Sequence, residues 1–153
     1  MNLSNAKGLT LIGLIAFIAS AASAQFATGF GLALPIAPAS LAVTVLVIGI
    51  AVIAASMPIL SYRRKKESGK TSSRPNPFYA VRVLLFSRAA QITAVGFLGW
   101  HLGLGIWLVA FTPAAVVQET FVAALLCLGG LLAALLAEWN CKAPKDGDEN
   151  EAA

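Results

Sequence analysis

Charge is what this sequence has least of. Only 12% of its 153 residues are Asp, Glu, Lys or Arg, and 58% are hydrophobic, whereas ordinary soluble domains have about 25% charged and about 45–50% apolar residues. The charges are also absent in long blocks, because none occurs within residues 8–62, 89–118 or 120–137. So little polar surface excludes a soluble globular domain, a disordered chain and a nucleic-acid-binding domain as descriptions of the whole chain. It predicts a polytopic membrane protein.

Side chains that carry chemistry are scarce as well. The sequence has a single histidine, His101, which makes no metal site by itself because a typical site needs three or four ligands. Its two cysteines are Cys127 and Cys141. The CxxC spacing of redox and zinc motifs is missing. No pair of carboxylates lies deep in a predicted span for acid–base catalysis, and no nucleophile stands at a recognisable spacing from a base. We therefore expect a protein that is not an enzyme and that holds no cofactor and no metal.

The charge-free runs predict an all-α membrane domain with four transmembrane helices. A helix needs about 20 mostly apolar residues to cross a hydrocarbon core of about 30 Å, and it satisfies its own backbone hydrogen bonds in lipid. Pro35 and Pro38, together with the glycines at 29 and 31, divide the longest run into two spans. The predicted domain covers residues 1–145, with helices at 8–27, 39–60, 89–111 and 116–137, and a disordered acidic tail follows at 146–153.

Positive charge gathers on one side of these spans. Most of the 11 lysines and arginines lie in the predicted basic loop, residues 61–88, while the loops at 25–38 and 112–115 have none. The positive-inside rule then predicts a plasma-membrane protein with both termini and the basic loop in the cytoplasm. Within the loop, Asn76-Pro77 is typical of a helix start, and residues 78–86 form an amphipathic lead-in to the third span.

A run of four cations directly follows the second span: Arg63, Arg64, Lys65 and Lys66. Such a run occurs in nucleic-acid-binding segments, but beside a span it is typical of a topogenic anchor that attracts anionic lipid headgroups. We interpret it as that anchor. The partners that this predicts are the lipid bilayer and anionic headgroups at the cytoplasmic face, not nucleic acid.

The first span has an alternative interpretation. Lys7, the apolar run at 9–18 and Ala22-Ser23-Ala24 before Gln25 resemble a signal peptide with a small-residue cleavage site. Cleavage would remove residues 1–24 and leave three helices. Small residues are also common where membrane helices pack, so we favour four retained helices while the charge bias leaves both topologies open.

Three further groups of residues are candidates for function or packing. His101, near the middle of the third span, is either an intramembrane site for proton or ion transfer or a neutral imidazole bonded to a Ser, Thr or Gln of a neighbouring helix; we favour the second. Arg88 and Glu138, at the inner ends of the third and fourth spans, are placed to form a structural ion pair. Gly99 and Gly103 form a GxxxG motif, which we expect to pack helices within one chain.

An ordered set of motifs in the second half resembles a known family. The motifs are Arg82-Val83-Leu84, Ser87-Arg88-Ala89, Gly99-Trp100-His101-Leu102-Gly103 and Glu138-Trp139-Asn140-Cys141-Lys142-Ala143-Pro144 before an acidic tail. They resemble the actinobacterial "domain of unknown function 3180" family, with the likeness sharpest over residues 76–146; His101 departs from it, since the family has an aromatic residue such as tyrosine there. The resemblance implies a small four-span plasma-membrane protein with no established activity and no assigned site residues.

Three hypotheses for function follow from these features. The leading one is a non-enzymatic integral membrane protein that binds other membrane or envelope components, another membrane protein among them. The alternative is a small transporter or channel subunit, for which His101 would be the intramembrane group. The third is an enzyme for lipid or cofactor precursors, for which the cytoplasmic edge offers only Arg82, Arg88, Glu138 and Asn140.

Overall fold

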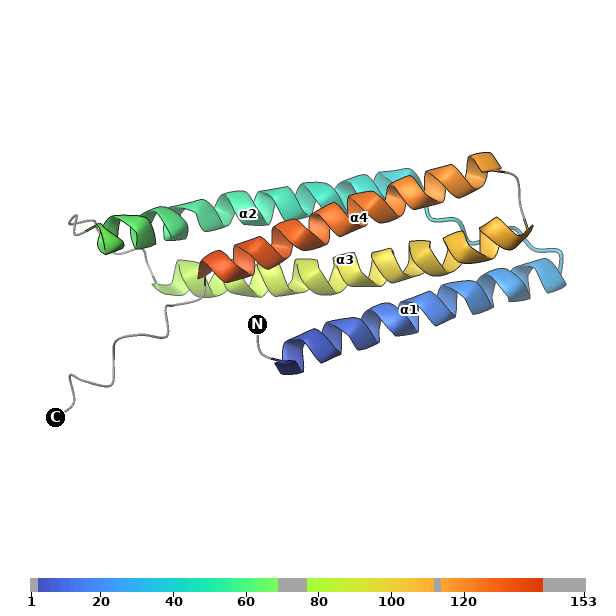
Figure 1. Ribbon diagram of the computed structural model, residues 1–153, viewed down its shortest axis with the longest axis horizontal. Helices are drawn as coiled ribbons and strands as arrows, with labels where there is room; N and C mark the ends of the chain where they lie inside the picture. The colour runs from blue at the N-terminus through green and yellow to red at the C-terminus, as the bar shows by residue number, and fades with distance from the viewer. Residues whose placement is uncertain (1–2, 69–76, 112–113, 142–153) are drawn as a thin grey trace.

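All the regular secondary structure of the described residues is helical. The computed structural model describes residues 3–68, 77–111 and 114–141, which form four α-helices and no strand (Figure 1). The helices are α1 (Leu3–Gly29), α2 (Ala39–Glu67), α3 (Pro77–Phe111) and α4 (Ala114–Cys141). Each is long and apolar enough to cross a membrane, so the predicted all-α fold with four membrane-spanning helices is confirmed. The predicted acidic tail, 146–153, lies outside the described residues.

The helices are longer than the predicted spans, and most of the predicted loop at 61–88 is helical. α2 continues through the basic run to Glu67, and α3 begins at Pro77 and runs for 35 residues. Hydropathy locates the part of a helix that lies in lipid, whereas lysine and arginine are themselves good helix formers and need not end it. The Asn76-Pro77 signal did locate the start of α3. Only the middle of the predicted loop, 69–76, lies outside the described residues.

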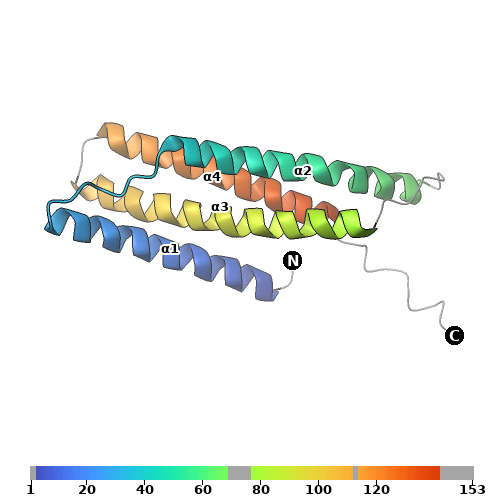
Figure 2. The same cartoon turned by 180° about the vertical axis from the view of Figure 1, so that it is seen from behind.

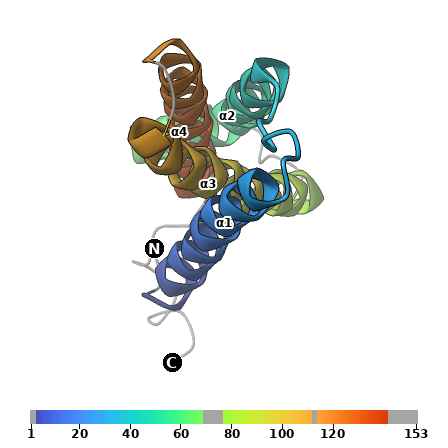
Figure 3. The same cartoon turned by 90° about the vertical axis from the view of Figure 1, so that its right-hand side faces the viewer.

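α3 is the central helix of the bundle. It packs against each of the other three helices, and α2 and α4 also pack against each other. α1 contacts α3 alone among the described helices, and the view along the long axis shows it to one side of the other three (Figure 3). α1 therefore depends on a single interface.

The helices alternate in direction along the chain, but consecutive helices are not always neighbours. α1 runs parallel to α3, α2 runs parallel to α4, and the two pairs run in opposite directions, as the front and back views agree (Figures 1 and 2). α3 and α4 form the antiparallel neighbours that a short connection favours. α1 and α2, although consecutive, make no contact with each other.

The segment between α1 and α2 explains how consecutive helices come to lie apart. α1 ends in a Schellman motif: Gly31 has φ +66°, and the Leu32 N–H donates to the Ala27 carbonyl at 2.8 Å. The chain then continues to α2 without regular secondary structure, and the Trp100 indole of α3 donates to the Pro35 carbonyl at 3.4 Å. The Schellman motif thus ends α1, and the indole bond holds the connecting segment against α3 before α2 begins.

Glycines allow the helix backbones to approach closely. A Cβ atom placed on Gly99 or on Gly103 would collide with the α1 carbonyl oxygens of Gly13 and Phe17, respectively. On the other side of the bundle, a Cβ on Gly49 of α2 would lie 2.6 Å from the carbonyl oxygen of Gly130 in α4. The GxxxG motif of the third span therefore packs helices within this chain, and α2 and α4 make the same kind of contact.

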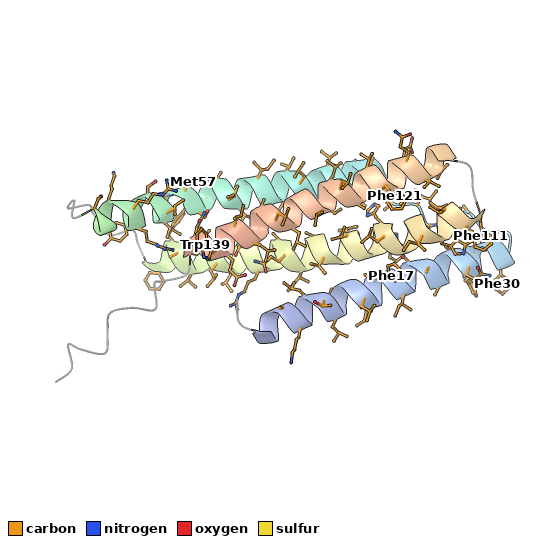
Figure 4. All side chains as sticks on the ribbon, in the orientation of Figure 1. Phe17, Phe30, Met57, Phe111, Phe121 and Trp139 are labelled. Atoms are coloured by element: carbon orange, nitrogen blue, oxygen red, sulfur yellow. The ribbon has the colours of Figure 1, made fainter. Side chains whose placement is uncertain are left out.

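The two ends of the bundle differ in their side chains. One end, here called the basic end, is where α2 finishes and α3 begins; its described cations are Arg63, Arg64, Lys65, Arg82 and Arg88. At the opposite end, Phe26 contacts Phe30, and Trp107 contacts Phe111. Figure 4 shows Phe30 and Phe111 at that end and Trp139 toward the basic end. Aromatic rings at both ends are typical of the two membrane–water interfaces.

Glycine-to-alanine substitutions in α3 test whether close backbone contact holds α1. We expect Gly99→Ala and Gly103→Ala each to destabilise the α1–α3 interface by about 1–3 kcal/mol, because the added methyl group forces the two helices apart. Gly96→Ala is the matched control, since a Cβ there meets nothing within 4 Å. Unfolding in mixed detergent micelles measures the differences. Equal effects at all three glycines would contradict the prediction.

Candidate functional site

Buried polar side chains gather toward the basic end, where α2, α3 and α4 converge. Four of them, here called the polar cluster, are Ser56 of α2, Gln91 of α3, and Glu138 and Asn140 of α4. Each is buried, and Glu138 is only 3% exposed. Burying a carboxyl group is costly unless it is hydrogen-bonded, so this cluster is the first place to look for a site.

Three hydrogen bonds between helices organise the polar cluster. The Gln91 side-chain amide donates to Glu138 Oε2 at 2.7 Å and to the Ala134 carbonyl oxygen at 3.3 Å, which joins α3 to α4. The Asn140 side-chain amide donates to Ser56 Oγ at 3.0 Å, which joins α4 to α2. The Ser56 hydroxyl in turn donates to the Ile53 carbonyl oxygen at 2.7 Å. The polar cluster therefore ties three helices together through their side chains.

Small residues beside the polar cluster make these bonds possible. Ala134 and Ala137 of α4 are fully buried and form a core group with Val52 of α2 and Ala90 of α3. Because these side chains are short, the helices lie close enough for Gln91 to reach a backbone carbonyl of α4. The small residues Ala134 and Ala137, one turn before and directly before Glu138, thus let the amide and the carboxyl group come together.

A tyrosine adds a further bond between α2 and α3 near the basic end. The Tyr79 hydroxyl donates to the Ala55 carbonyl oxygen at 2.7 Å. Pro58 lies inside α2 and has no N–H to offer the carbonyl of Ala54, four residues earlier. Tyr79 therefore joins α2 beside the carbonyl that the proline leaves without its helical partner, as neighbouring groups commonly do around prolines in membrane helices.

His101 lies in the core, apart from the polar cluster. It is 2% exposed, and its position two residues from both Gly99 and Gly103 places it on the face of α3 that turns away from α1. Its Nδ1 lies 2.7 Å from the Phe97 carbonyl oxygen of its own helix. The expected bond to a Ser, Thr or Gln of another helix is therefore replaced by one to a carbonyl a turn earlier.

The second nitrogen of His101 is the more informative atom. With Nδ1 donating to the Phe97 carbonyl oxygen, Nε2 is the ring nitrogen that remains for another contact. Nε2 is buried and has no hydrogen-bond partner among the described residues. Across residues 3–68, 77–111 and 114–141, no three His, Cys, Asp or Glu side chains gather as a metal site would require. Cys127 and Cys141 are free thiols.

The remaining predicted residues occupy the basic end. Arg88 lies one turn before Gln91 and its side chain is exposed, whereas Gln91 donates to the buried Glu138 carboxyl group. Arg64 and Lys65 are exposed on the last turns of α2, and Arg63 beside them is half-buried. Lys66 belongs to the same helix, and its side chain lies outside the described set.

Several residues that hold the site together had been overlooked in the sequence. They are Gln91, Ser56 and Tyr79, together with Gln25 of α1, whose side-chain oxygen accepts a 3.0 Å hydrogen bond from the Trp107 indole of α3. A glutamine within an otherwise apolar span can be recognised in the sequence as a candidate for hydrogen bonding. Its partner cannot be predicted from the sequence, because the helix register that joins residues 91 and 138 is set by packing.

Comparison with known proteins gives one match. The sequence model of a family described as "Protein of unknown function (DUF3180)" matches residues 9–145, which takes in all four helices apart from the first residues of α1. No curated protein and no solved structure matches the chain. The matched family thus agrees with the resemblance in the sequence motifs.

The two bonds between side chains of the polar cluster should differ in strength. In a double-mutant cycle, we expect a coupling of about 1–1.5 kcal/mol between Gln91→Leu and Glu138→Leu, because this bond is short at 2.7 Å and both side chains are buried. The pair Asn140→Ala and Ser56→Ala, whose bond is longer at 3.0 Å, is the matched comparison, with an expected coupling of about 0.6 kcal/mol. Unfolding in mixed micelles measures both. A coupling at the Asn140–Ser56 pair as large as that at Gln91–Glu138 would contradict this assignment.

Proposed function

The chain belongs to the DUF3180 family of proteins of unknown function, and from that premise we propose that it is a non-enzymatic multi-pass protein of the plasma membrane that binds other membrane or envelope components. The observation that supports this proposal is the way in which the buried polar side chains are hydrogen-bonded. Gln91, Glu138, Asn140 and Ser56 bond to one another or to helix backbone. Groups engaged in this way hold helices together and are not poised around a reacting molecule.

The outer surface of the bundle supports the same proposal. Large apolar side chains are exposed along every helix, among them Ile18 at 58%, Ile106 at 58% and Leu125 at 66%. In a membrane these faces meet lipid chains or the apolar helices of other proteins. Because most of this surface is apolar, we expect the protein to act mainly by binding other components within the bilayer.

The orientation that we propose has both termini in the cytoplasm. The described arginines and lysines of α2 and α3 lie at the basic end, where anionic headgroups and the positive-inside rule favour them. α1 runs parallel to α3, so its beginning, with Lys7, lies toward that end. The polar cluster is then close to the cytoplasmic face.

We propose further that the first helix is retained. Ala24, after which a signal peptidase would cut, is fully buried and belongs to a core group with Leu104 and Leu108 of α3. Next to it, Gln25 is bonded to Trp107. Gly13 and Phe17 fit against the glycines of α3. Contacts from Gly13 to Gln25 give α1 a role that a removable leader would not need.

A second candidate function, proton or ion transfer, is favoured by one observation, the buried Nε2 of His101. The packing around it favours the first candidate. His101 and Gln91 of the polar cluster lie ten residues apart on α3. A core group that includes Val45, Ala94, Ala123 and Cys127 fills the bundle between them. A transported ion would have to displace this packed layer.

Reporter fusions test the orientation. A reporter enzyme active only outside the cytoplasm should be inactive when inserted after Ser68 and active when inserted after Gly31, because these sites lie at opposite ends of the bundle. A cytoplasmic reporter at the same two sites should give the reverse pattern, and intact mass shows whether residues 1–24 are still attached. An active external reporter after Ser68 would refute the proposed orientation.

Photo-crosslinking in cells tests the binding role. A crosslinking residue at the exposed positions Leu125 and Ile106 should capture discrete membrane components, while the same residue at Leu104, which is fully buried, should capture none from outside the chain. In proteoliposomes, we expect His101→Ala to leave proton flux unchanged. A proton flux that requires His101, with no adducts at the exposed positions, would replace the binding role by transport.

A further inference from the structure

An apolar groove runs along the seam between α2 and α3. Its volume is about 190 Å³, and its walls are formed by Val45, Ile48 and Val52 of α2 and by Phe86, Ala89, Ala90 and Thr93 of α3. Phe86 is 67% exposed and Ile48 is 44% exposed, so the groove opens to the side of the bundle. Thr93 is the one hydroxyl among these seven side chains. The groove is thus a lipid-facing hollow in the half of the bundle near the basic end.

A cation lies on the same face of α3, one turn closer to the basic end. Arg82 precedes Phe86 by four residues and follows Tyr79 by three, so the three side chains share one face of the helix. Tyr79 reaches α2 through its bond to the Ala55 carbonyl, and Phe86 lines the groove, which shows that this face borders the seam. The Arg82 side chain is exposed, and helical side chains lean toward the helix N-terminus, here the basic end.

We infer that the α2–α3 groove is a binding site for one anionic phospholipid, with an acyl chain in the groove and the phosphate on the Arg82 guanidinium. The distances along α3 suit such a ligand. Phe86 to Thr93 is a rise of about 10 Å, and Arg82 lies about 6 Å farther toward the basic end. Arginine binds phosphate through two parallel N–H donors, which makes this contact stronger than a diffuse attraction.

Charge decides between this occupant and a helix from a second copy of the chain. A packed helix from another copy would cover Arg82 with apolar surface and leave its charge without a partner, which is costly. A phospholipid offers an apolar chain and an anionic phosphate in the order in which the groove and Arg82 occur. The inference rests on the proposed orientation in one respect: the lipid would come from the cytoplasmic leaflet, where anionic headgroups attract basic segments.

Lipid retention by the purified full-length protein tests the site. In native mass spectrometry from a mild detergent, with added phosphatidylglycerol or phosphatidylcholine, we expect phosphatidylglycerol to bind at least about tenfold more tightly, because only it carries a net negative charge. Arg82→Gln should weaken phosphatidylglycerol binding by about tenfold or more. Arg88→Gln is the matched control, an exposed cation on another face of the same helix, and should change binding by no more than about twofold.

Filling the groove gives an independent result. Ala89→Trp should abolish tight phosphatidylglycerol binding while Arg82 is still present, because the indole occupies the space of the acyl chain. Ile92→Trp, at an exposed position of α3 that is not among the groove-lining residues, is the control and should bind lipid as the unaltered protein does. Thermal unfolding of each variant shows whether it is folded.

Three outcomes would overturn the inference. They are equal losses with Arg82→Gln and Arg88→Gln, which would indicate diffuse attraction to basic residues; equal retention of phosphatidylcholine; and a dimer that Ala89→Trp converts to monomer, which would indicate a second copy in the groove. These measurements do not depend on orientation. A reversed reporter pattern would therefore refute the proposed orientation while leaving the lipid site in place, and loss of the lipid site would leave the orientation unaffected.

Discussion

Close contact between helix backbones is the constraint on which this bundle depends. In lipid there is no hydrophobic force to drive one apolar helix against another, so association relies on packing and on hydrogen bonds between helices. At Gly99 and Gly103 the backbone of α3 meets carbonyl groups of α1, and at Gly49 the backbone of α2 meets that of α4. Each of these sites excludes even a methyl group. The helix order of the bundle follows from where they lie, and so does the position of α1 at one side.

The polar cluster adds specificity to this packing. Gln91 and Glu138 come from different helices, and their bond is made at one relative register of α3 and α4. A shift of one turn would separate the amide from the carboxyl group and leave a buried acidic side chain without that donor, which is unfavourable. Buried polar pairs that fix the register of apolar helices are known in coiled coils. By the same argument, the polar cluster has a structural role in this bundle: it fixes the register of α3 and α4.

The two sides of α3 near the basic end have different tasks. Its inner face carries Gln91, which bonds within the bundle, while the face toward the α2 seam carries Arg82 and Phe86 beside an open groove. Packing is tight where α3 meets α1 at the glycines and more open where it meets α2. That difference gives a small, almost featureless membrane protein one surface with a defined shape and a defined charge. Arg82 and Phe86 beside the groove therefore suit the proposed ligand class, a lipid with an anionic headgroup and an apolar chain.

Much of this architecture was determined by the sequence alone, because the physics involved is local. Charge-free runs of sufficient length require helices in lipid, the cluster of cations indicates an orientation, and Asn76-Pro77 marks where α3 begins. The outer limits of the helices were less visible, since helix continues beyond the apolar part. Only the tertiary structure decided which faces meet: that consecutive helices α1 and α2 do not touch, that His101 bonds its own helix, and that Gln91 donates to Glu138. Those outcomes depend on the register and rotation of each helix against its neighbours, which arise from the fit of many small side chains at once and are not encoded in any one segment.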